Sequence, residues 1–258
     1  MHVLGLATGP GVPADPLADR LAADLPGSVA VLERSADAGA EHTRFELGPG
    51  GTTTRRPDGD LQRALDDLAR DHDHAVLVGF ADTSVPHVVV GDADAETALV
   101  RAATPDDLDS ETVVRALDDY DEHESLESLV AEVTRASSAE YAGAVATFTG
   151  IVREREHPDD DRTESLTFEK YEGVAAERLA RIRDELEARD GVHEVRLHHR
   201  TGRIAAGDDI VFVVVLAGHR REAFETVEDG IDRLKDEVPI FKKELTVEDE
   251  FWTHERDE

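Results

Sequence analysis

The chain has 258 residues, a formal net charge of −31 and 40% hydrophobic residues, and it contains no cysteine. Without cysteine there are no disulfides, thiolate metal sites or cysteine nucleophiles, so any sulfur that the protein handles must arrive on a partner or a substrate. No apolar run approaches the roughly 18 residues of a membrane span, and the first residues do not resemble a signal peptide. We therefore expect a cytoplasmic protein. Its negative charge repels nucleic acid and anionic membranes, so we expect it to bind neither.

The basic residues are unevenly chosen, because 24 of the 28 are arginine and only four are lysine. The lysines are Lys170, Lys235, Lys242 and Lys243. Together with the acidic composition, this choice favours a halophilic protein, since high salt screens the repulsion between like charges. The apolar content and the periodic segments argue against disorder. In a chain that disfavours lysine, the positions that keep it are candidates for function.

The first half of the chain alternates strands with helices. Apolar runs predict strands at 3–7, 28–32, 75–80 and 87–91, helical spacing predicts helices at 15–25 and 61–68, and composition indicates a loop or an edge at 43–58. This alternation indicates a small parallel α/β domain over residues 1–104. Residues 105–124 are rich in Asp and Glu, and we expect an acidic linker with a short helical patch at 113–117.

The second half, residues 125–258, shows both periodicities without that alternation. We expect helices at 126–133, 175–189 and 222–236, strands at 143–150, 165–171, 195–199, 209–217 and 240–245, a polar loop at 153–162, and turns at 202–204 and 206–208. The pattern indicates an α+β domain with a mainly antiparallel sheet and flanking helices on one face.

The first candidate site is a turn between a buried strand and a helix. The chain turns at Gly218, which leaves His219 and Arg220 at the helix N-terminus. Free backbone N–H groups and the positive end of the helix dipole meet two cationic side chains there, and this favours a bound phosphate or carboxylate. A surface turn with solvated cations is the alternative.

The second candidate site holds lysines. Lys235 closes the predicted helix, Pro239 breaks it, and Lys242 follows on the next strand. We expect Phe241 to face inward, so that Lys242 points to the opposite face. A lysine near other cations loses its proton more readily and can act as a base or a nucleophile. Helix-end capping with a solvated strand residue is the alternative, and Arg153 equally fits an ordinary strand end.

Six ordered segments resemble the catalytic (large) subunit of molybdopterin synthase, over about residues 125–256. They are GAVATFTGIVR at 143–153, LTFEKY at 166–171, HRTGR at 199–203, GD at 207–208, GHR at 218–220 and VPIFKKE at 238–244. The ordered set is specific, whereas either cationic segment alone would not be.

The resemblance implies a sulfur-transfer reaction that needs no cofactor. The substrate would be cyclic pyranopterin monophosphate, and its two sulfurs would come from the C-terminal thiocarboxylate of a small ubiquitin-like sulfur-carrier subunit. It implies that Lys235 and Lys242 are catalytic, and that Arg153, His219 and Arg220 bind the substrate. The flanking positions that would line the same pocket are Ile151, Val152, Lys243 and Glu244.

The predicted helix also sets a distance. His219 and Lys235 are sixteen positions apart, and at about 1.5 Å per residue roughly 20–25 Å separates them. One subunit cannot easily bring both ends of this helix to one small substrate. We therefore expect a homodimer in which the neighbouring subunit supplies His219 and Arg220. Together with the carrier that the resemblance implies, the assembly would be a heterotetramer.

The opening strand VLGL at 3–6, the pair GF at 79–80 after a strand, and PHVVV at 86–90 resemble segments of the molybdopterin-guanine dinucleotide biosynthesis adaptor family, which has a P-loop fold. The first domain would be a degenerate member. A working P-loop needs Gly-Lys-Ser/Thr, but this chain has Pro13, Ala14, Asp15 and Pro16 at the corresponding place. We expect no GTP hydrolysis and favour a nucleotide-free docking role. A GTP-binding adaptor and a non-catalytic scaffold are the alternatives. The histidines of 71–74 and 198–199 lack the spacing of a strong metal site, so no metal is expected.

Overall fold

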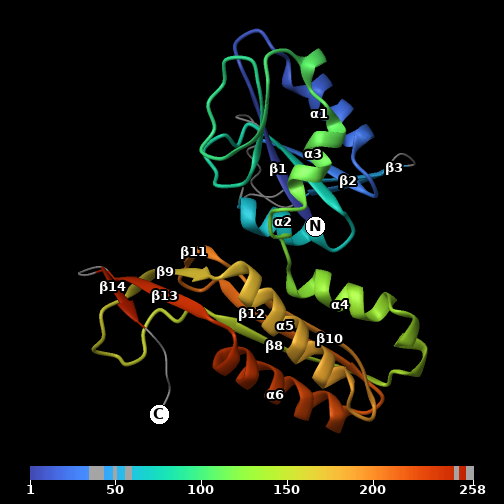
Figure 1. Ribbon diagram of the computed structural model, residues 1–258, viewed down its shortest axis with the longest axis vertical. Coiled ribbons are helices and arrows are strands. Elements are labelled where there is room, and N and C mark those ends of the chain that lie inside the picture. The colour runs from blue at the N-terminus through green and yellow to red at the C-terminus, as the bar shows by residue number, and fades with distance from the viewer. Residues whose placement is uncertain (35–43, 49–50, 56–59, 247–249, 254–258) are drawn as a thin grey trace. The chain divides into compact units, whose positions relative to one another are not determined.

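The computed structural model describes residues 1–34, 44–48, 51–55, 60–246 and 250–253 (Figure 1). The chain divides into two compact units, Met1–Glu124 and Ser125–Glu258.

The stretch expected as an acidic linker belongs to the first unit, which corrects the sequence-based prediction. Residues 105–124 contain a short 3-10 turn, Pro105–Asp107, and helix α3 (Ser110–Leu117). Val113 and Leu117 of α3 are 0% and 1% exposed in the core of the first unit. An amphipathic helix buries its apolar stripe wherever a core can receive it, even when its outer face is acidic.

The first unit is built on a parallel sheet in the order β2-β5-β1-β6-β7. The strands are β1 (His2–Thr8), β2 (Val29–Glu33), β5 (His74–Val78), β6 (His87–Val90) and β7 (Ala98–Ala102). Helices α1 (Ala14–Asp24) and α3 cover one face, and α2 (Leu61–Ala69) covers the other. The predicted parallel α/β domain is confirmed. Strand β7 was not predicted, because its ALVRA sequence is short and partly exposed.

A second small element of the first unit lies where the sequence indicated a loop or an edge. Strands β3 (Arg44–Gly48) and β4 (Gly51–Arg55) pair as an antiparallel hairpin. The remainder of 43–58 lies outside the described residues.

The second unit holds two antiparallel sheets. The first has the order β10-β12-β8, and the second has the order β11-β9-β13-β14. Their strands are β8 (Ala144–Ile151), β9 (Thr163–Lys170), β10 (Val192–His199), β11 (Gly202–Ala205), β12 (Asp209–Ala217), β13 (Ile240–Thr246) and β14 (Glu250–Thr253). The mainly antiparallel α+β fold is confirmed. The turn expected at 202–204 is instead strand β11, because these residues pair with β9.

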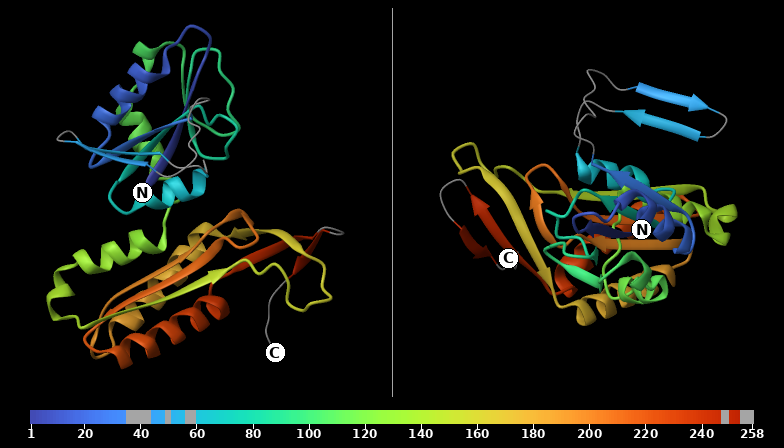
Figure 2. Two further views of the ribbon diagram at one scale, coloured as in Figure 1. Left: turned by 180° about the vertical axis from the view of Figure 1, so that it is seen from behind. Right: turned by 90° about the horizontal axis from the view of Figure 1, so that it is seen from above.

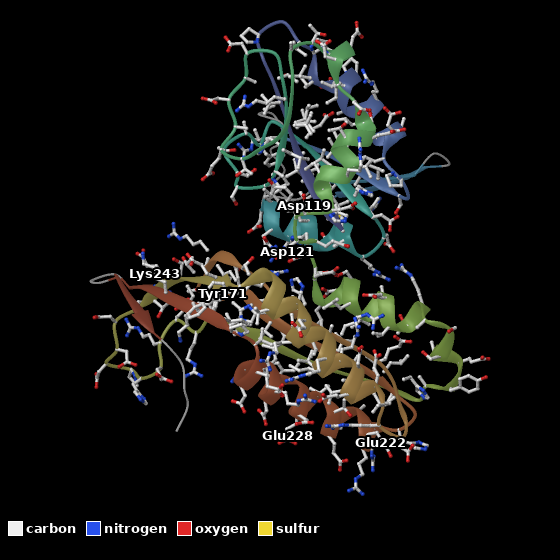
Figure 3. All side chains as sticks on the ribbon, viewed as in Figure 1. Asp119, Asp121, Tyr171, Glu222, Glu228 and Lys243 are labelled. Atoms are coloured by element: carbon white, nitrogen blue, oxygen red, sulfur yellow. The ribbon has the colours of Figure 1, made fainter. Side chains whose placement is uncertain are left out.

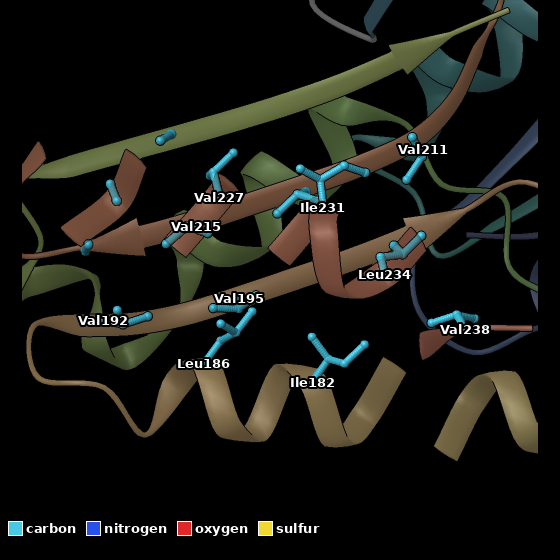
Figure 4. Packing of buried hydrophobic residues seen from close by; sticks show 14 of the residues in the cluster. Ile182, Leu186, Val192, Val195, Val211, Val215, Val227, Ile231, Leu234 and Val238 are labelled. Atoms are coloured by element: carbon cyan, nitrogen blue, oxygen red, sulfur yellow. The ribbon is translucent and has the colours of Figure 1, made fainter. Parts of the chain in front are cut away.

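Helices cover both faces of the first of these sheets, rather than the one face that was predicted. They are α4 (Leu126–Arg135), α5 (Glu172–Glu187) and α6 (Arg220–Glu237). Alternate residues of β12 from Val211 to Ala217 pack with α5 and α6 (Figure 4), and the residues between them pack with α4. A strand that is apolar on both faces requires cover on both.

Local signals fix the start of α4 and the end of α6. A capping box starts α4, because the hydroxyls of Ser125 and Ser128 accept hydrogen bonds from each other's backbone N–H groups at 3.1 and 2.9 Å. Helix α6 ends at Glu237 because Pro239 disfavours a helical conformation at Val238, whose φ and ψ are −90° and 123°. Lys235 is therefore held in the last turn, just before the chain enters β13.

Candidate active site

Arg153 and Lys235 lie at the same end of the second unit. Arg153 follows β8, whose last residue Ile151 is paired with Asp209, the first residue of β12. Helix α6 packs back along β12, so its end returns to this place. Figure 4 shows Leu234, the neighbour of Lys235, toward the Val211 end of β12.

The Arg153 guanidinium is exposed and already faces a carboxylate. It donates a hydrogen bond to Glu156 at 2.9 Å, with the two side chains 67% and 72% exposed. Such a surface ion pair is worth about 0–1 kcal/mol. A phosphate can therefore take the place of Glu156 at little cost.

Strand β13 places its two lysines on opposite faces of its sheet. Lys242 lies directly across from Phe168 of β9, whereas Lys243 lies across from Thr167. Phe168 belongs to a small buried core, so Lys242 shares the face of that core, and Lys243 has the other face. Both lysine side chains are half-buried.

Phe241 does not face that core, which corrects the orientation predicted from the sequence. Its ring meets Tyr171 edge-on, with centroids 5.6 Å apart, and it lies across from the exposed Glu169. Pairing with β9 decides which alternate residues of β13 face inward, and this register puts Ile240 and Lys242 on the buried side.

The remaining flanking residues have different surroundings. Ile151 is 58% exposed, whereas Val152 is 1% exposed and packs in the same small core as Phe168. Glu244 lies in β13 across from Leu166, but its side chain lies outside the described residues.

His219 and Arg220 lie at the opposite end of the second unit. His219 is the N-cap of α6, and both side chains are exposed. Gly143 is required beside this turn, because a Cβ there would lie 2.5 Å from the carbonyl oxygen of Gly218. Figure 3 shows Glu222, two residues after Arg220, far from Lys243. The views of Figure 2 show the same extended second unit.

Two groups of cations are therefore separated within one chain. Arg153, Lys235 and Lys242 lie toward one end of the sheets, and His219 and Arg220 lie at the other. The continuous helix α6 confirms the predicted spacing, since sixteen positions correspond to about 24 Å. A small ligand cannot contact both groups of one chain at once.

A buried histidine near the lysines was not among the predicted site residues. His199 is 8% exposed, and its Nδ1 lies 2.7 Å from the carbonyl oxygen of Arg200. Burial lowers the pKa of His199 to about 4, the hydrogen bond to Arg200 opposes that shift, and the charge of Lys170 adds to it. The sequence signal was available: alternation along β10 puts His199 on the face of Leu197 and Val195, which are apolar.

The glycine-rich loop after β1 lacks the geometry of a phosphate cradle. Gly9 donates its N–H to the carbonyl of Val90 at 2.8 Å, and Val12 donates to Gly9 at 3.1 Å. A Cβ at Gly9 would lie 2.6 Å from the backbone nitrogen of Asp92, so the loop is closed against β6. The first turn of α1 carries Asp15 and no cation.

The described part of the chain contains neither a metal-binding cluster nor a membrane-spanning helix. No group of three or more His, Cys, Asp or Glu side chains there is arranged to hold a metal ion. None of its helices is both long enough and apolar enough to cross a membrane.

The fold and these groups define a class for the second unit. It is an α+β domain whose exposed arginine and histidine side chains are candidates for binding an anion, and whose lysine amines are candidates for chemistry. The family model described as "MoaE protein" matches residues 121–237.

Relatives give the particular family. A "Probable molybdopterin synthase" from Haloferax volcanii is 50% identical over 264 aligned residues, which cover 99% of this chain and 100% of the relative. The molybdopterin synthase catalytic subunit of Yersinia pestis is 40% identical, across 49% of this chain and 82% of its own. The crystal structure of molybdopterin synthase from Staphylococcus aureus is 37% identical, covers 45% of this chain and 83% of that chain, and has a TM-score of 0.42.

The chain belongs to the family of molybdopterin synthase catalytic subunits, enzymes of the sulfur transfer that forms molybdopterin. The region matched by the family model lies almost wholly in the second unit. The first unit lies outside that match except for residues 121–124, but it aligns with the Haloferax relative, whose alignment runs through both units.

Proposed function

We propose that the second unit converts cyclic pyranopterin monophosphate to molybdopterin, with sulfur from the C-terminal thiocarboxylate of a small ubiquitin-like carrier subunit. One observation carries the assignment of the site: all four lysines of the chain lie in the segments that adjoin the start of β13, with Lys243 on the other face of the sheet. Lys235 ends α6, Lys242 and Lys243 lie in β13, and Lys170 lies across from Ile240. In a chain with 24 arginines, this gathering favours a role for the amines that a guanidinium cannot fill.

The proposed roles follow from the chemistry of each group. Arg153, His219 and Arg220 bind the substrate and its phosphate, because guanidinium and imidazole groups pair well with phosphate oxygens. Lys235 or Lys242 promotes attack on the carrier thiocarboxylate or transiently holds a reactant, while the cations balance developing oxyanion charge. The carrier sulfur bonds to a side-chain carbon of the pterin and displaces an oxygen substituent from that carbon. Water then attacks the acyl carbon of the carrier, the bond between that carbon and the sulfur breaks, and the carrier leaves with a carboxylate. A second carrier repeats the step for the second sulfur.

We also propose that each site is completed by a second copy of the chain. The separation of about 24 Å along α6 leaves Lys235 and His219 unable to reach one substrate together. A two-fold dimer can bring the His219 end of one subunit to the Lys235 end of the other, and forms two equivalent sites. With one carrier at each site, the assembly is a heterotetramer.

Conversion of the pterin precursor by thiocarboxylated carrier in vitro tests the assignment of the lysines. We expect Lys235→Ala and Lys242→Ala each to lower kcat by roughly 10²–10⁴-fold, the range for loss of a group that moves protons or attacks. Arg220→Ala should instead raise KM, with Arg221→Ala as its matched control. Arg221 is next in the chain and already bound to Glu225 at 2.7 Å. Near-normal transfer by both lysine variants would exclude them as catalytic groups.

For the first unit we propose a docking role that needs no nucleotide. The closed loop after β1 uses its amides internally, and Asp15 repels phosphate where a P-loop lysine would attract it. Calorimetric titration of the full chain with GTP and Mg²⁺ is expected to show no binding at millimolar nucleotide. Saturable binding, or GTP hydrolysis above that of buffer, would favour the GTP-binding adaptor instead.

A further inference from the structure

His199 lies under the sheet that carries the lysines. It is the last residue of β10 and pairs with Val211 of β12, so its ring is on the face that α5 and α6 cover. Its neighbour His198 is on the opposite face, where its ring stacks on Phe212. Two adjacent histidines thus occupy two distinct environments, and only His199 approaches the second sheet.

The contacts of His199 define its protonation. A carbonyl oxygen only accepts hydrogen bonds, so the Nδ1 atom 2.7 Å from the Arg200 carbonyl carries a proton. With a pKa lowered to about 4 by burial, the ring is neutral near pH 7, and its Nε2 carries a lone pair. If His199 were protonated, the positive charge of Lys170 would repel its ring.

The ring of His199 is linked to Lys242 through one residue. It meets the ring of Phe168 edge-on, with centroids 4.9 Å apart and planes at 70°. Phe168 lies directly across from Lys242 in the β9–β13 pair. Side chains directly opposite each other in antiparallel strands share a face, with Cβ atoms about 4.5–5.5 Å apart. His199, Phe168 and Lys242 therefore form a continuous row.

We propose that His199 is a positioning residue for sulfur transfer: it holds the ring of Phe168, and thereby fixes the direction in which Lys242 leaves the sheet. The inference rests on the proposed catalytic role of Lys242. A misplacement of about 1 Å at a reacting group costs up to roughly 100-fold in rate, so a row that fixes one amine has a large effect on kcat and a small one on substrate affinity.

The first test compares His199→Leu with His198→Leu in the full chain. We expect His199→Leu to lower kcat by roughly 10- to 100-fold while KM changes less than about twofold. His198→Leu should leave both near their original values, since that ring faces α4. Equal kcat values in the two variants would overturn the proposal.

The second test measures the position of Lys242 without the reaction. An amine-acylating reagent labels exposed lysines, and peptide mass spectrometry gives the rate at Lys242 and at Lys243, which lies on the other face. The ratio of the two rates should change severalfold in His199→Leu and stay constant in His198→Leu. The labelling rates are measured without carrier or pterin. They therefore test the position of Lys242 even if Lys242 proves dispensable for sulfur transfer.

A third pair of variants separates positioning from folding. His199→Asn keeps an N–H near the place of Nδ1 and should recover part of the lost kcat. If His199 acts through Phe168, then His199→Leu should change the labelling ratio little further in a Phe168→Leu chain. Full additivity of the two substitutions contradicts the proposal. If Lys242→Ala is inactive but the ratio of labelling rates is unchanged in His199→Leu, the proposed function stands and only the role of His199 is excluded.

Discussion

Burial separates His198 and His199, although they are neighbours of the same type. The first stacks on Phe212 and is half-buried, and the second is 8% exposed with its Nδ1 bound to a backbone carbonyl. Burial lowers the pKa of His199 to about 4. The environment of His199 therefore keeps its ring neutral in weak acid.

This shift predicts how stability depends on pH. The unfolded chain takes up a proton at His199 near pH 6.5, but the folded chain does so only near pH 4. The free energy of unfolding therefore falls as pH falls from 6.5 to 4, and His199 accounts for about 3 kcal/mol of that fall. Urea unfolding at pH 7 and pH 4 should show a smaller fall for His199→Leu than for the parent chain.

His198→Leu serves as the control in that experiment. Carboxylates also titrate in this range, and they contribute equally to both histidine variants. If the two variants lose the same free energy between pH 7 and pH 4, the buried histidine is not the source.

At the scale of elements, α5 and α6 are joined by ion pairs above their shared core. Arg233 of α6 donates to Glu185 of α5 at 2.5 Å and to Glu237 at 2.7 Å, and Arg181 of α5 also contacts Glu237. The Arg233 side chain is only 19% exposed. Partly buried charges that bridge two helices are screened less than single surface pairs.

We therefore expect Arg233→Met to lower the free energy of unfolding by about 1 kcal/mol, and high KCl to reduce the difference. The matched control is Arg221→Met, because its pair with Glu225 is 81% and 59% exposed, and it should cost close to zero. Urea denaturation of both variants at low and high KCl measures the two effects. Equal losses would mean that the bridge between the helices adds nothing.

Some strands and turns could be predicted from the local sequence pattern, and others could not. The apolar run of β12 and the turn at Gly218 were readable because each depends on neighbours in the sequence. Strand β11 was predicted as a turn, because only its pairing with β9 makes GRIA a strand. The inward side of β13 was also mispredicted, since that choice is made by the register with β9 and not by alternation itself.

At the scale of the whole molecule, the shared site makes a quantitative prediction. At a substrate concentration far below the KM of Arg220→Ala, Lys235→Ala and Arg220→Ala are each expected to be nearly inactive alone, because every site in either dimer lacks one group. In subunits unfolded together and refolded at equal amounts, about half of the dimers are mixed, and one site in each mixed dimer is intact. Activity should recover to about a quarter of that of the parent chain.

The control for this mixture is Lys235→Ala with Lys242→Ala. Both groups lie toward the same end of one chain, so no mixed dimer has a complete site and no recovery is expected. If the first mixture stays inactive, or the second recovers equally, the two cation groups do not come from different subunits.

The sequence by itself determined the class of the chain and most of its candidate residues. Composition, ordered motifs and helix length are local or additive properties, so they can be read without a structure. The helix length already indicated that His219 and Lys235 lie far apart in one chain. Tertiary structure alone decided that 105–124 belongs to the first unit, that helices cover β12 on both faces, and that Lys242 shares a face with Phe168. These outcomes depend on contacts between residues far apart in the chain, as does the row from His199 to Lys242, and no local pattern contains them.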